Sequence, residues 1–379
     1  MELNKLKISV SSASGVEGIT KREIYNLIGK EVAFLSGRAD FFGSISDVAR
    51  LNICLRTANK VYVVLKEFTA TTFDELFEGV YSFEWNKLLE KNAKVFVDAK
   101  SVKSALFALS SIQSITKKAI VNSLTGKDGF LNETGKEYFL EVSILNDKVS
   151  ILLNTSGQGL HKRGYRDLVW KAPLKETLAS AIVLNSVYKW DRPLIDPFCG
   201  SGTIAIESAL IGQNIAPGIN REFALEKCEE YRKFFDAERS RAKDEEKRDR
   251  KLTIYGYDIE SKAINLCYHH AKNAGVEKCV HFERRDARKL SSGFSHGIII
   301  TNPPYGERLL GNSEIESLYT DFFKRFLSLD EWCLYFLSSY ENTEKCFNKK
   351  ADKRRKMYNS SIECTLYTYL GKPPKKERE

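Results

Sequence analysis

The sequence predicts an α/β protein with a Rossmann-like, mostly parallel sheet in its C-terminal half, preceded by two smaller α+β segments. Three observations carry this prediction. From residue 173 onward, strand-like and helix-like stretches alternate, as they do in a parallel sheet covered by helices. Residues 1–66 follow a β-α-β-β-α-β order of ferredoxin type. The length of 379 residues suits two or three domains, and a hydrophobic content of 42% suits a folded chain.

The N-terminal half is read from its hydrophobic spacing. The first segment is expected to contain strands at 3–10, 31–36, 41–45 and 61–66, with helices at 16–29 and 47–57. The second is expected to contain helices at 72–89 and 103–123 and strands at 94–98, 138–145 and 148–154. Thr72 with Glu75 three residues later forms a capping-box pattern. Asn146-Asp147 is a turn pair that suits a hairpin between the last two strands.

The C-terminal half alternates more regularly. Its expected helices are 173–189, 202–212, 260–274 and 314–327, and its expected strands are 193–196, 252–257, 279–283, 297–301, 332–338 and 363–370. Residues 155–171 form a loop by composition, and the mixed charges of 239–251 indicate a solvated helix face. His269 and His270 are interpreted as ordinary helix residues.

Composition excludes several classes of protein. No run approaches the roughly 18 apolar residues of a membrane helix. The first residues lack the features of a signal peptide. The eight cysteines form no C-x-x-C pair and the five histidines no H-E-x-x-H motif, so we expect reduced thiols, no metal site and a cytoplasmic protein. The net charge of +9 permits a polyanionic partner.

The first chemical motif is a glycine turn between a strand and a helix. Residues 194–203 read LIDPFCGSGT, and an apolar helix follows. Gly200 and Gly202 would let the backbone approach a nucleotide-like ligand at the carboxyl end of the strand. The spacing departs from G-x-G-x-x-G, and the Lys and Ser/Thr of a P-loop are absent. A plain tight turn is the alternative interpretation.

Two further acidic residues follow predicted strands. Asp258 closes the strand 252–257, where a carboxylate accepts hydrogen bonds from ribose hydroxyls. It lies far beyond the usual ~20 residues after the glycine turn, so an inserted helix within 220–250 must account for the gap. Asp286-Ala287 follows the strand 279–283 and suits a contact to an adenine amino group, although a turn aspartate is the simpler interpretation.

The motif that decides the class is Asn302-Pro303-Pro304-Tyr305, directly after the apolar strand 297–301. The Asn302 amide oxygen and the Pro303 carbonyl, held by two prolines, would present two acceptors in fixed geometry. Two such acceptors suit an NH₂ group, because accepting both hydrogens orients the nitrogen lone pair toward an electrophile. Tyr305 offers a flat face for a planar substrate.

These motifs together resemble the class I S-adenosylmethionine-dependent methyltransferases that act on amino groups. Three strings, 158–166 (QGLHKRGYR), 172–177 (APLKET) and 302–309 (NPPYGERL), resemble the bacterial guanine-N2 methyltransferases of large-subunit ribosomal RNA that carry a THUMP domain. The resemblance implies a ferredoxin-like segment at 1–66, a THUMP RNA-binding domain at 67–157 and a methyltransferase domain at 158–379. Some relatives carry a second methyltransferase domain, for which 379 residues leave no room.

The resemblance also implies the cofactor, S-adenosylmethionine, and the residues of the site. The residues implied around the cofactor are Asp196, Pro197, Phe198, Gly200, Gly202, Thr203, Asp258, Ile259, Asp286 and Ala287. Asn302, Pro303, Pro304 and Tyr305 are implied at the target amine. The basic and aromatic residues expected to contact RNA are His161, Lys162, Arg163, Tyr165, Arg166, Arg308, Lys353, Arg354 and Arg355.

The expected reaction is methyl transfer to the N2 atom of a guanosine in RNA, most simply 23S ribosomal RNA, by a monomer or weak oligomer. Adenine N6 and a protein glutamine amide also present an NH₂ group, so both remain alternative substrates. A non-catalytic RNA-binding assembly factor is the alternative from a different class. The intact motif at 302–305 argues against that last interpretation.

Overall fold

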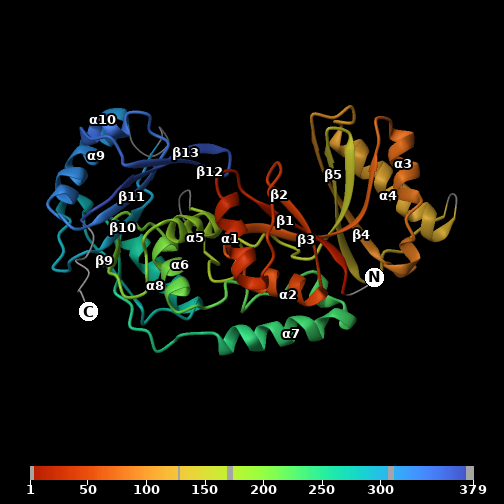
Figure 1. Ribbon diagram of the computed structural model, residues 1–379, viewed down its shortest axis with the longest axis horizontal. Helices are drawn as coiled ribbons and strands as arrows, with labels where there is room; N and C mark the ends of the chain where they lie inside the picture. Colours follow the sequence, from red (N-terminus) through yellow and green to blue (C-terminus); the bar gives the residue numbers. More distant parts are fainter. Residues whose placement is uncertain (1–3, 127–128, 169–173, 306–310, 373–379) are drawn as a thin grey trace. The chain divides into compact units, whose positions relative to one another are not determined.

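The computed structural model describes residues 4–126, 129–168, 174–305 and 311–372. The chain divides into two compact units (Figure 1). Unit 1 comprises residues 1–11, 24–160 and 222–241, and unit 2 comprises residues 12–23, 161–221 and 242–379. Each unit contains one sheet, so the chain follows the expected α/β class.

Unit 1 is formed around a six-stranded mixed sheet in the order β2-β1-β3-β6-β5-β4. Strands β4 and β5 are parallel, whereas β1–β2, β3–β6 and β5–β6 are antiparallel. Helices α3 and α4 pack together at the β4–β5 end of this sheet (Figure 1). The elements from the N-terminus to the end of this sheet are β1 (Leu6–Ser12), α1 (Glu17–Ile28), β2 (Arg38–Gly43), α2 (Ile45–Cys54), β3 (Ala58–Thr69), α3 (Phe73–Tyr81), η1 (Trp85–Lys87), β4 (Lys94–Val102), α4 (Leu109–Thr125), β5 (Glu137–Leu145) and β6 (Lys148–Asn154).

Local signals account for most of these elements, with two corrections. The expected strand at 31–36 is absent: only an isolated bridge joins Leu35 to Arg38, because Ser36 and Gly37 turn the chain with φ of 50° and 78°. The expected helix at 72–89 ends at Tyr81, although its capping box at Thr72 and Glu75 is confirmed. The Asn146-Asp147 hairpin is also confirmed, and both residues have positive φ.

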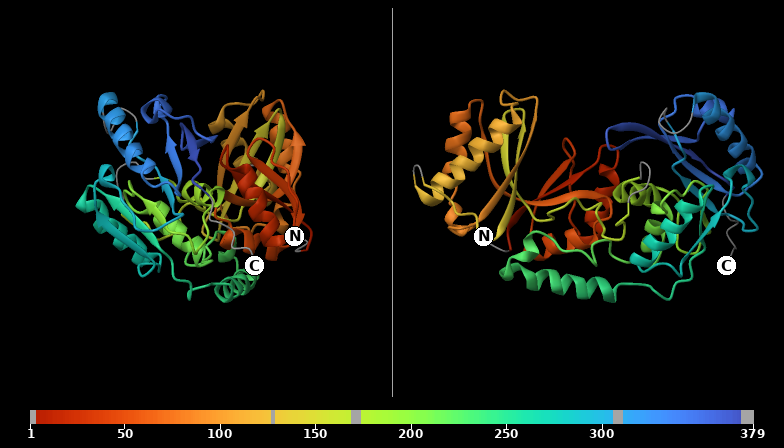
Figure 2. Two further views of the ribbon diagram at one scale, coloured as in Figure 1. Left: turned by 60° about the vertical axis from the view of Figure 1, so that its left-hand side comes forward. Right: turned by 180° about the vertical axis from the view of Figure 1, so that it is seen from behind.

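Residues 222–241 lie within the methyltransferase half of the sequence but belong to unit 1. They include most of the long helix α7 (Glu229–Asp244), visible in both views of Figure 2. Glu238 of α7 pairs with Arg50 of α2 at 3.3 Å, with both side chains largely buried. Beyond this contact most charged side chains from 240 to 251 are exposed, as expected for a solvated face.

Unit 2 is formed around a seven-stranded sheet in the order β12-β13-β11-β10-β7-β8-β9. The neighbours from β11 to β9 are parallel, and β13 is antiparallel to both β11 and β12. A mostly parallel sheet with an antiparallel end is therefore confirmed. Between β6 and the C-terminus, in addition to α7, the elements are α5 (Glu176–Asn185), β7 (Leu194–Asp196), α6 (Thr203–Gly212), η2 (Leu225–Lys227), β8 (Ile254–Asp258), α8 (Ser261–Asn273), β9 (Val280–Arg284), η3 (Ala287–Lys289), β10 (Ile298–Thr301), α9 (Asn312–Leu327), β11 (Cys333–Ser338), α10 (Thr343–Phe347), β12 (Lys353–Asn359) and β13 (Ile362–Tyr369).

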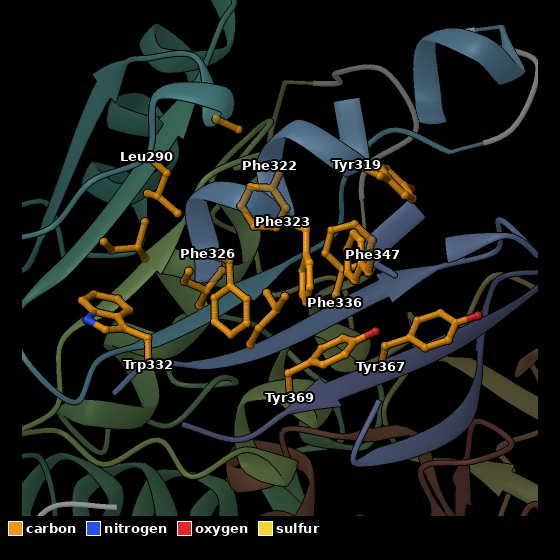
Figure 3. Close-up of a cluster of buried hydrophobic side chains, with 14 of the residues drawn as sticks. Leu290, Tyr319, Phe322, Phe323, Phe326, Trp332, Phe336, Phe347, Tyr367 and Tyr369 are labelled. Atoms are coloured by element: carbon orange, nitrogen blue, oxygen red, sulfur yellow. The ribbon is translucent and has the colours of Figure 1, made fainter. Parts of the chain in front are cut away.

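An aromatic core lies beside the carboxyl ends of β10 and β11 (Figure 3). The rings of Phe323 and Phe347 stack at 4.1 Å between centroids, and Phe322 meets Phe336 at 5.8 Å. Buried aromatic side chains of this size contribute about 1.5–3 kcal/mol each. This core holds α9 and α10 against the sheet, next to the end of β10 where the Asn302 motif begins.

Within the described part of the chain, no helix is long and apolar enough to cross a membrane. In the same residues, no group of three or more His, Cys, Asp or Glu side chains is arranged to hold a metal ion.

Candidate functional site

The predicted glycine turn connects β7 to α6 at the carboxyl edge of the parallel sheet. Gly200 and Gly202 both have positive φ, at 51° and 83°, which glycine adopts without strain. A Cβ atom on Gly202 would come within 3.2 Å of Cys267 Sγ and of the Phe282 ring, whereas one on Gly200 would meet nothing within 4 Å. The turn therefore packs closely at Gly202 and is open at Gly200.

Asp196 ends β7 and links the glycine turn to the Asn302 motif. Its Oδ1 accepts hydrogen bonds from the Phe198 amide at 3.2 Å and from the Thr301 hydroxyl at 2.7 Å. Burial raises the pKa of this carboxyl from 3.8 to about 7. Thr301 directly precedes Asn302, so Asp196 connects the two strand ends on which the predicted cofactor and target residues lie. The ring of Phe198 packs edge-on against Phe322 of the aromatic core, at 5.4 Å between centroids.

Asp258 lies next to the glycine turn, despite the long gap in sequence. Because β8 pairs with β7, the two strands end side by side. The Asp258 carboxylate accepts hydrogen bonds from the Gly200 amide at 3.0 Å and the Glu260 amide at 2.9 Å. Burial raises the pKa of Asp258. The neighbouring Ile259 is 56% exposed, so its side chain is free to pack on a ligand.

Asp286 is more constrained than expected. It caps the short helix η3, and its carboxylate accepts hydrogen bonds from the Arg288 Nε and Nη2 atoms at 3.0 and 2.6 Å. These hydrogen bonds lower the pKa of Asp286. Ala287 beside it is buried. An adenine contact would therefore share this carboxylate with Arg288.

The Asn302–Tyr305 motif follows β10, as predicted, and is held from two directions. Tyr319 of α9 donates a hydrogen bond to the Pro304 carbonyl at 3.1 Å. The Tyr305 hydroxyl accepts a hydrogen bond from Asn359 Nδ2 at 3.1 Å, at the end of β12. Burial raises the pKa of both tyrosines, which keeps them neutral donors and acceptors.

One polar atom of this motif, the side-chain oxygen of Asn302, lacks a hydrogen-bond donor among the described residues. Asn302 Oδ1 is buried and accepts no hydrogen bond from any residue that the structure describes. A buried amide oxygen without a donor costs about 1–3 kcal/mol, so such an atom indicates a ligand that supplies an N–H group.

In the basic and aromatic segment 161–166, which was expected to contact RNA, two side chains are buried. Arg163 and Tyr165 are buried, at 5% and 4% exposure. Both meet the buried Glu207 of α6, Tyr165 through a hydrogen bond at 3.0 Å and Arg163 at 3.6 Å. Arg166 pairs with Glu176 of α5 at 3.0 Å. We therefore correct the expectation that Arg163 and Tyr165 contact RNA, because neither side chain reaches the surface.

The remaining expected RNA contacts differ in their exposure. Lys162 is exposed and His161 half-buried, with burial lowering the His161 pKa to about 4. Lys353, Arg354 and Arg355 are exposed on the edge strand β12, which the sequence had not predicted as a strand. Arg354 pairs with Glu344 at 2.6 Å. Arg308 lies outside the described residues.

Several residues near the site carried no signal in the sequence. Tyr319, Asn359 and Asp167 contact the predicted site residues or their supports from positions distant in the chain. His269 and His270 lie on α8 as expected, but His270 also donates a hydrogen bond to the Ser201 carbonyl in the glycine turn. Only the tertiary structure brings these groups together.

Comparison with known proteins finds three domain families along the chain. Residues 163–368 match the RMKL-like methyltransferase domain, residues 7–62 the RlmL ferredoxin-like domain and residues 70–154 the THUMP domain. The boundary expected at residue 66 lies between the first and second N-terminal matches, inside β3.

Individual relatives agree with these matches. YpsC of Bacillus subtilis, provisionally named an RNA methyltransferase, is 40% identical over 384 residues that cover 100% of both chains. Ribosomal RNA large subunit methyltransferase K/L of Photobacterium profundum is 29% identical over 97% of this chain and 54% of its own length, so the chain spans about half of that relative. The crystal structure of SMU.472, provisionally named a methyltransferase and solved with SAH, is 38% identical with a TM-score of 0.91, covering 98% of this chain and 100% of that one.

The strand order and the glycine turn place unit 2 among the class I methyltransferases, whose methyl donor is S-adenosylmethionine. Within that class, the chain belongs to the RMKL-like methyltransferase family, whose domain matches more than half of its 379 residues.

Proposed function

We propose that this protein transfers the methyl group of S-adenosylmethionine to the exocyclic N2 atom of a guanosine in RNA, and that the RNA is 23S ribosomal RNA. The observation that carries the proposal is the buried Asn302 Oδ1, which lacks a donor among the described residues. Support for an RNA substrate comes from the THUMP match and from the names of YpsC and the K/L relative.

The chemistry required of the chain is mainly positioning. When bound, S-adenosylmethionine supplies an electrophilic methyl group on a sulfonium. Asn302 Oδ1 and the Pro303 carbonyl would accept the two N–H groups of the target amine, so that its lone pair points at that methyl group. The Tyr319 hydrogen bond to Pro304 and the Asn359 hydrogen bond to Tyr305 hold the motif in place for this task. The proton of the methylated nitrogen leaves to water after transfer.

The residues available to the cofactor fit a nucleoside with a charged sulfur. The open face at Gly200 admits close approach of the ligand to the backbone. Asp258 lies beside Gly200 and suits the ribose hydroxyls, with Ile259 exposed next to it. The others that we assign to this site are Asp196, Pro197, Phe198, Gly202, Thr203, Asp286 and Ala287.

RNA contact is assigned to the exposed cations. Lys353 and Arg355 lie on β12, and the structure shows no ion pair or hydrogen bond between their side chains and any described residue. Lys162 is a further exposed cation, in the loop before α5. His161 beside it is half-buried and, with a pKa of about 4, adds no charge at neutral pH. Lysine and arginine side chains of this kind bind phosphates by releasing counterions.

The test is methylation of RNA taken from cells that lack the protein, followed by digestion to nucleosides and mass spectrometry. We expect N2-methylguanosine to appear with the wild-type protein and not with Asn302→Ala, while both bind S-adenosylhomocysteine equally. Asn26→Ala, at an exposed position of α1, is the matched control and should retain full activity. N6-methyladenosine as the product would replace guanine with adenine as the target, and full activity in Asn302→Ala would refute the mechanism.

A further inference from the structure

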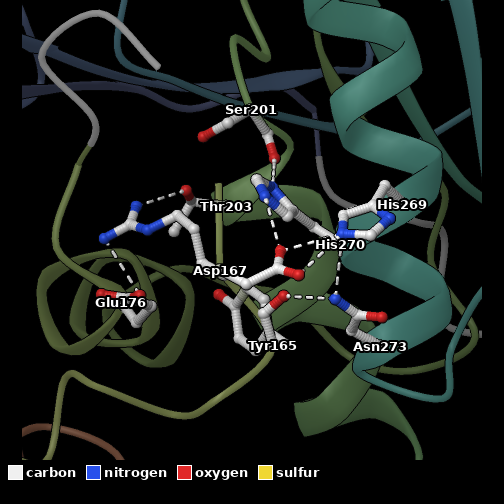
Figure 4. Close-up of polar contacts among 9 residues, drawn as sticks. Tyr165, Asp167, Glu176, Ser201, Thr203, His269, His270 and Asn273 are labelled. Atoms are coloured by element: carbon white, nitrogen blue, oxygen red, sulfur yellow. Dashed lines mark hydrogen bonds and ion pairs between the residues drawn. The ribbon is translucent and has the colours of Figure 1, made fainter. Parts of the chain in front are cut away.

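Side chains of helix α8 and of the loop 161–168 form hydrogen bonds with residues of the glycine turn (Figure 4). Ser201 lies between Gly200 and Gly202, so its backbone is flanked by two residues that are free to adopt many conformations. A turn of this composition needs contacts from elsewhere to hold one conformation. Gly200 is held by Asp258, which accepts a hydrogen bond from its amide, and by Cys267 Sγ, which donates to its carbonyl at 3.1 Å. Two further contacts reach the residues on either side of Gly202.

The first contact comes from His270 of α8, which is fully buried. Its Nδ1 atom donates a hydrogen bond to the Ser201 carbonyl at 3.1 Å. Its Nε2 atom is buried and makes no hydrogen bond with any described residue. The group that faces Nε2 is the carboxylate of Asp167, whose Oδ1 lies 4.0 Å away.

Asp167 ties the loop to the same helix. Its carboxylate oxygens lie 2.9 and 3.0 Å from Nε2 of His269, the residue next to His270. The hydrogen bond from His269 lowers the pKa of Asp167, so the carboxylate is ionised. Asn273, one turn further along α8, donates to the Tyr165 carbonyl at 3.1 Å. The loop is therefore fixed to α8 at two points.

The second contact comes from Arg166, the residue before Asp167. Its Nη1 atom donates to the Thr203 hydroxyl at 3.4 Å and to the Leu174 carbonyl at 3.0 Å, and its Nη2 lies 3.0 Å from Glu176. Thr203 begins α6, directly after the turn. The adjacent residues Arg166 and Asp167 therefore reach both sides of the turn, one directly and one through the histidines of α8.

We propose that His270 and Asp167 are positioning residues that hold the Ser201 carbonyl, and with it the glycine turn, in the conformation that binds S-adenosylmethionine. The inference rests on the proposed assignment of this turn to the cofactor. Neither side chain needs to touch the cofactor, because each acts through the backbone of residues 200–202. Arg166 and His269 are the other charged or titratable groups that face His270.

The experiment measures the dissociation constant of S-adenosylhomocysteine by calorimetry, and the KM values for S-adenosylmethionine and RNA, in the full-length protein. His270→Leu removes the donor to Ser201, and we expect affinity to fall about tenfold. His270→Asn keeps an N–H near the position of Nδ1 and should restore affinity to within about threefold of wild type. Lys272→Ala, an exposed position on the same helix, is the matched control and should bind as wild type does.

Asp167→Ala is expected to weaken binding about threefold. In the double variant with His270→Leu the two losses should not add, because both act on the same carbonyl. The KM for S-adenosylmethionine should rise while the KM for RNA stays constant, which a general loss of folding would not produce.

Three outcomes would overturn the inference: affinity in His270→Leu within twofold of wild type, equal losses in the leucine and asparagine variants, or a parallel rise of both KM values. If His270→Leu does not fold, Asp167→Ala decides, since that side chain is 53% exposed and its loss leaves the core intact. A wild-type protein that fails to bind S-adenosylhomocysteine would instead refute the proposed cofactor site, which separates the two failures.

Discussion

Replacing Asp196 with asparagine should remove one contribution to the pH dependence of the unfolding free energy. The carboxyl lies at the end of β7, 1% exposed, and burial raises its pKa from 3.8 to about 7. The folded protein therefore holds a proton on Asp196 between these two values, whereas the unfolded chain does not. The stability that this group contributes is fully present below pH 3.8 and is lost as the pH rises through 7.

The magnitude follows from the two pKa values. A difference from 3.8 to about 7 corresponds to about 4 kcal/mol of stability lost over the whole range. Between pH 5 and pH 8, the loss is about 2.5 kcal/mol. Asparagine keeps an acceptor for the Thr301 hydroxyl and the Phe198 amide but carries no charge. The NH₂ group of the asparagine side chain, if left without an acceptor, lowers the unfolding free energy by about 1–3 kcal/mol at every pH.

The assay is urea unfolding of wild type and Asp196→Asn, without cofactor, at pH 5, 6, 7 and 8. The difference in unfolding free energy, variant minus wild type, should increase by about 2.5 kcal/mol from pH 5 to pH 8. Asp286→Asn is the control, because Arg288 lowers the pKa of that carboxyl below 3.8. Asp286 is therefore ionised in the folded and the unfolded chain throughout pH 5–8, and the difference for this variant should not change with pH. A difference that does not change with pH for Asp196→Asn would refute the assignment of a buried carboxyl with a raised pKa.

Three further predictions concern the supports of the site and the RNA contacts. Tyr319→Phe removes the donor to the Pro304 carbonyl, and kcat should fall about tenfold with unchanged affinity for S-adenosylhomocysteine; an unchanged kcat would show that the motif needs no such support. Glu207→Ala leaves Tyr165 and Arg163 without their shared carboxylate and should lower the unfolding free energy by about 3–5 kcal/mol in urea titrations, whereas Glu207→Gln should lose clearly less. Lys353→Ala with Arg355→Ala should weaken RNA binding and reduce the slope of log affinity against log salt by about 1.5, measured by fluorescence anisotropy, and Arg354→Ala, whose charge pairs with Glu344, should change the slope less.

Local signals predicted most of the sheet of unit 2. The alternation of apolar strands and amphipathic helices predicted a mostly parallel sheet, and the observed pairings from β11 to β9 are parallel. Strand β12 escaped prediction because its first four residues are exposed cations on an edge strand. Such a strand has little apolar alternation to detect, since edge strands commonly carry charges that discourage further pairing.

Sequence predicts the position of a candidate site residue in the fold where the residue belongs to one short motif, and fails where the position depends on tertiary contacts. Gly200, Gly202 and Asn302 come from continuous motifs at strand ends, so sequence places them correctly at one edge of the sheet. The basic residues at 161–166 suggested an RNA contact, but their partners, Glu176 on α5 and Glu207 on α6, are separated from them by up to 44 residues in the chain. Sequence alone does not show whether a cation faces a phosphate or a buried carboxylate.

The geometry of the Asn302–Tyr305 motif does not by itself select the target base. In the proposed mechanism, Asn302 Oδ1 and the Pro303 carbonyl accept the two hydrogens of an NH₂ group, and both guanine (at N2) and adenine (at N6) carry such a group. These two atoms therefore supply orientation for methyl transfer but no discrimination between the bases. Choice of the target nucleotide must come from contacts outside the motif, which bind the RNA and present one base. We therefore expect variants of the exposed cations Lys353 and Arg355, as phosphate contacts, to weaken the binding of all RNAs about equally. Variants of Asn302 should slow methyl transfer without changing which base is methylated.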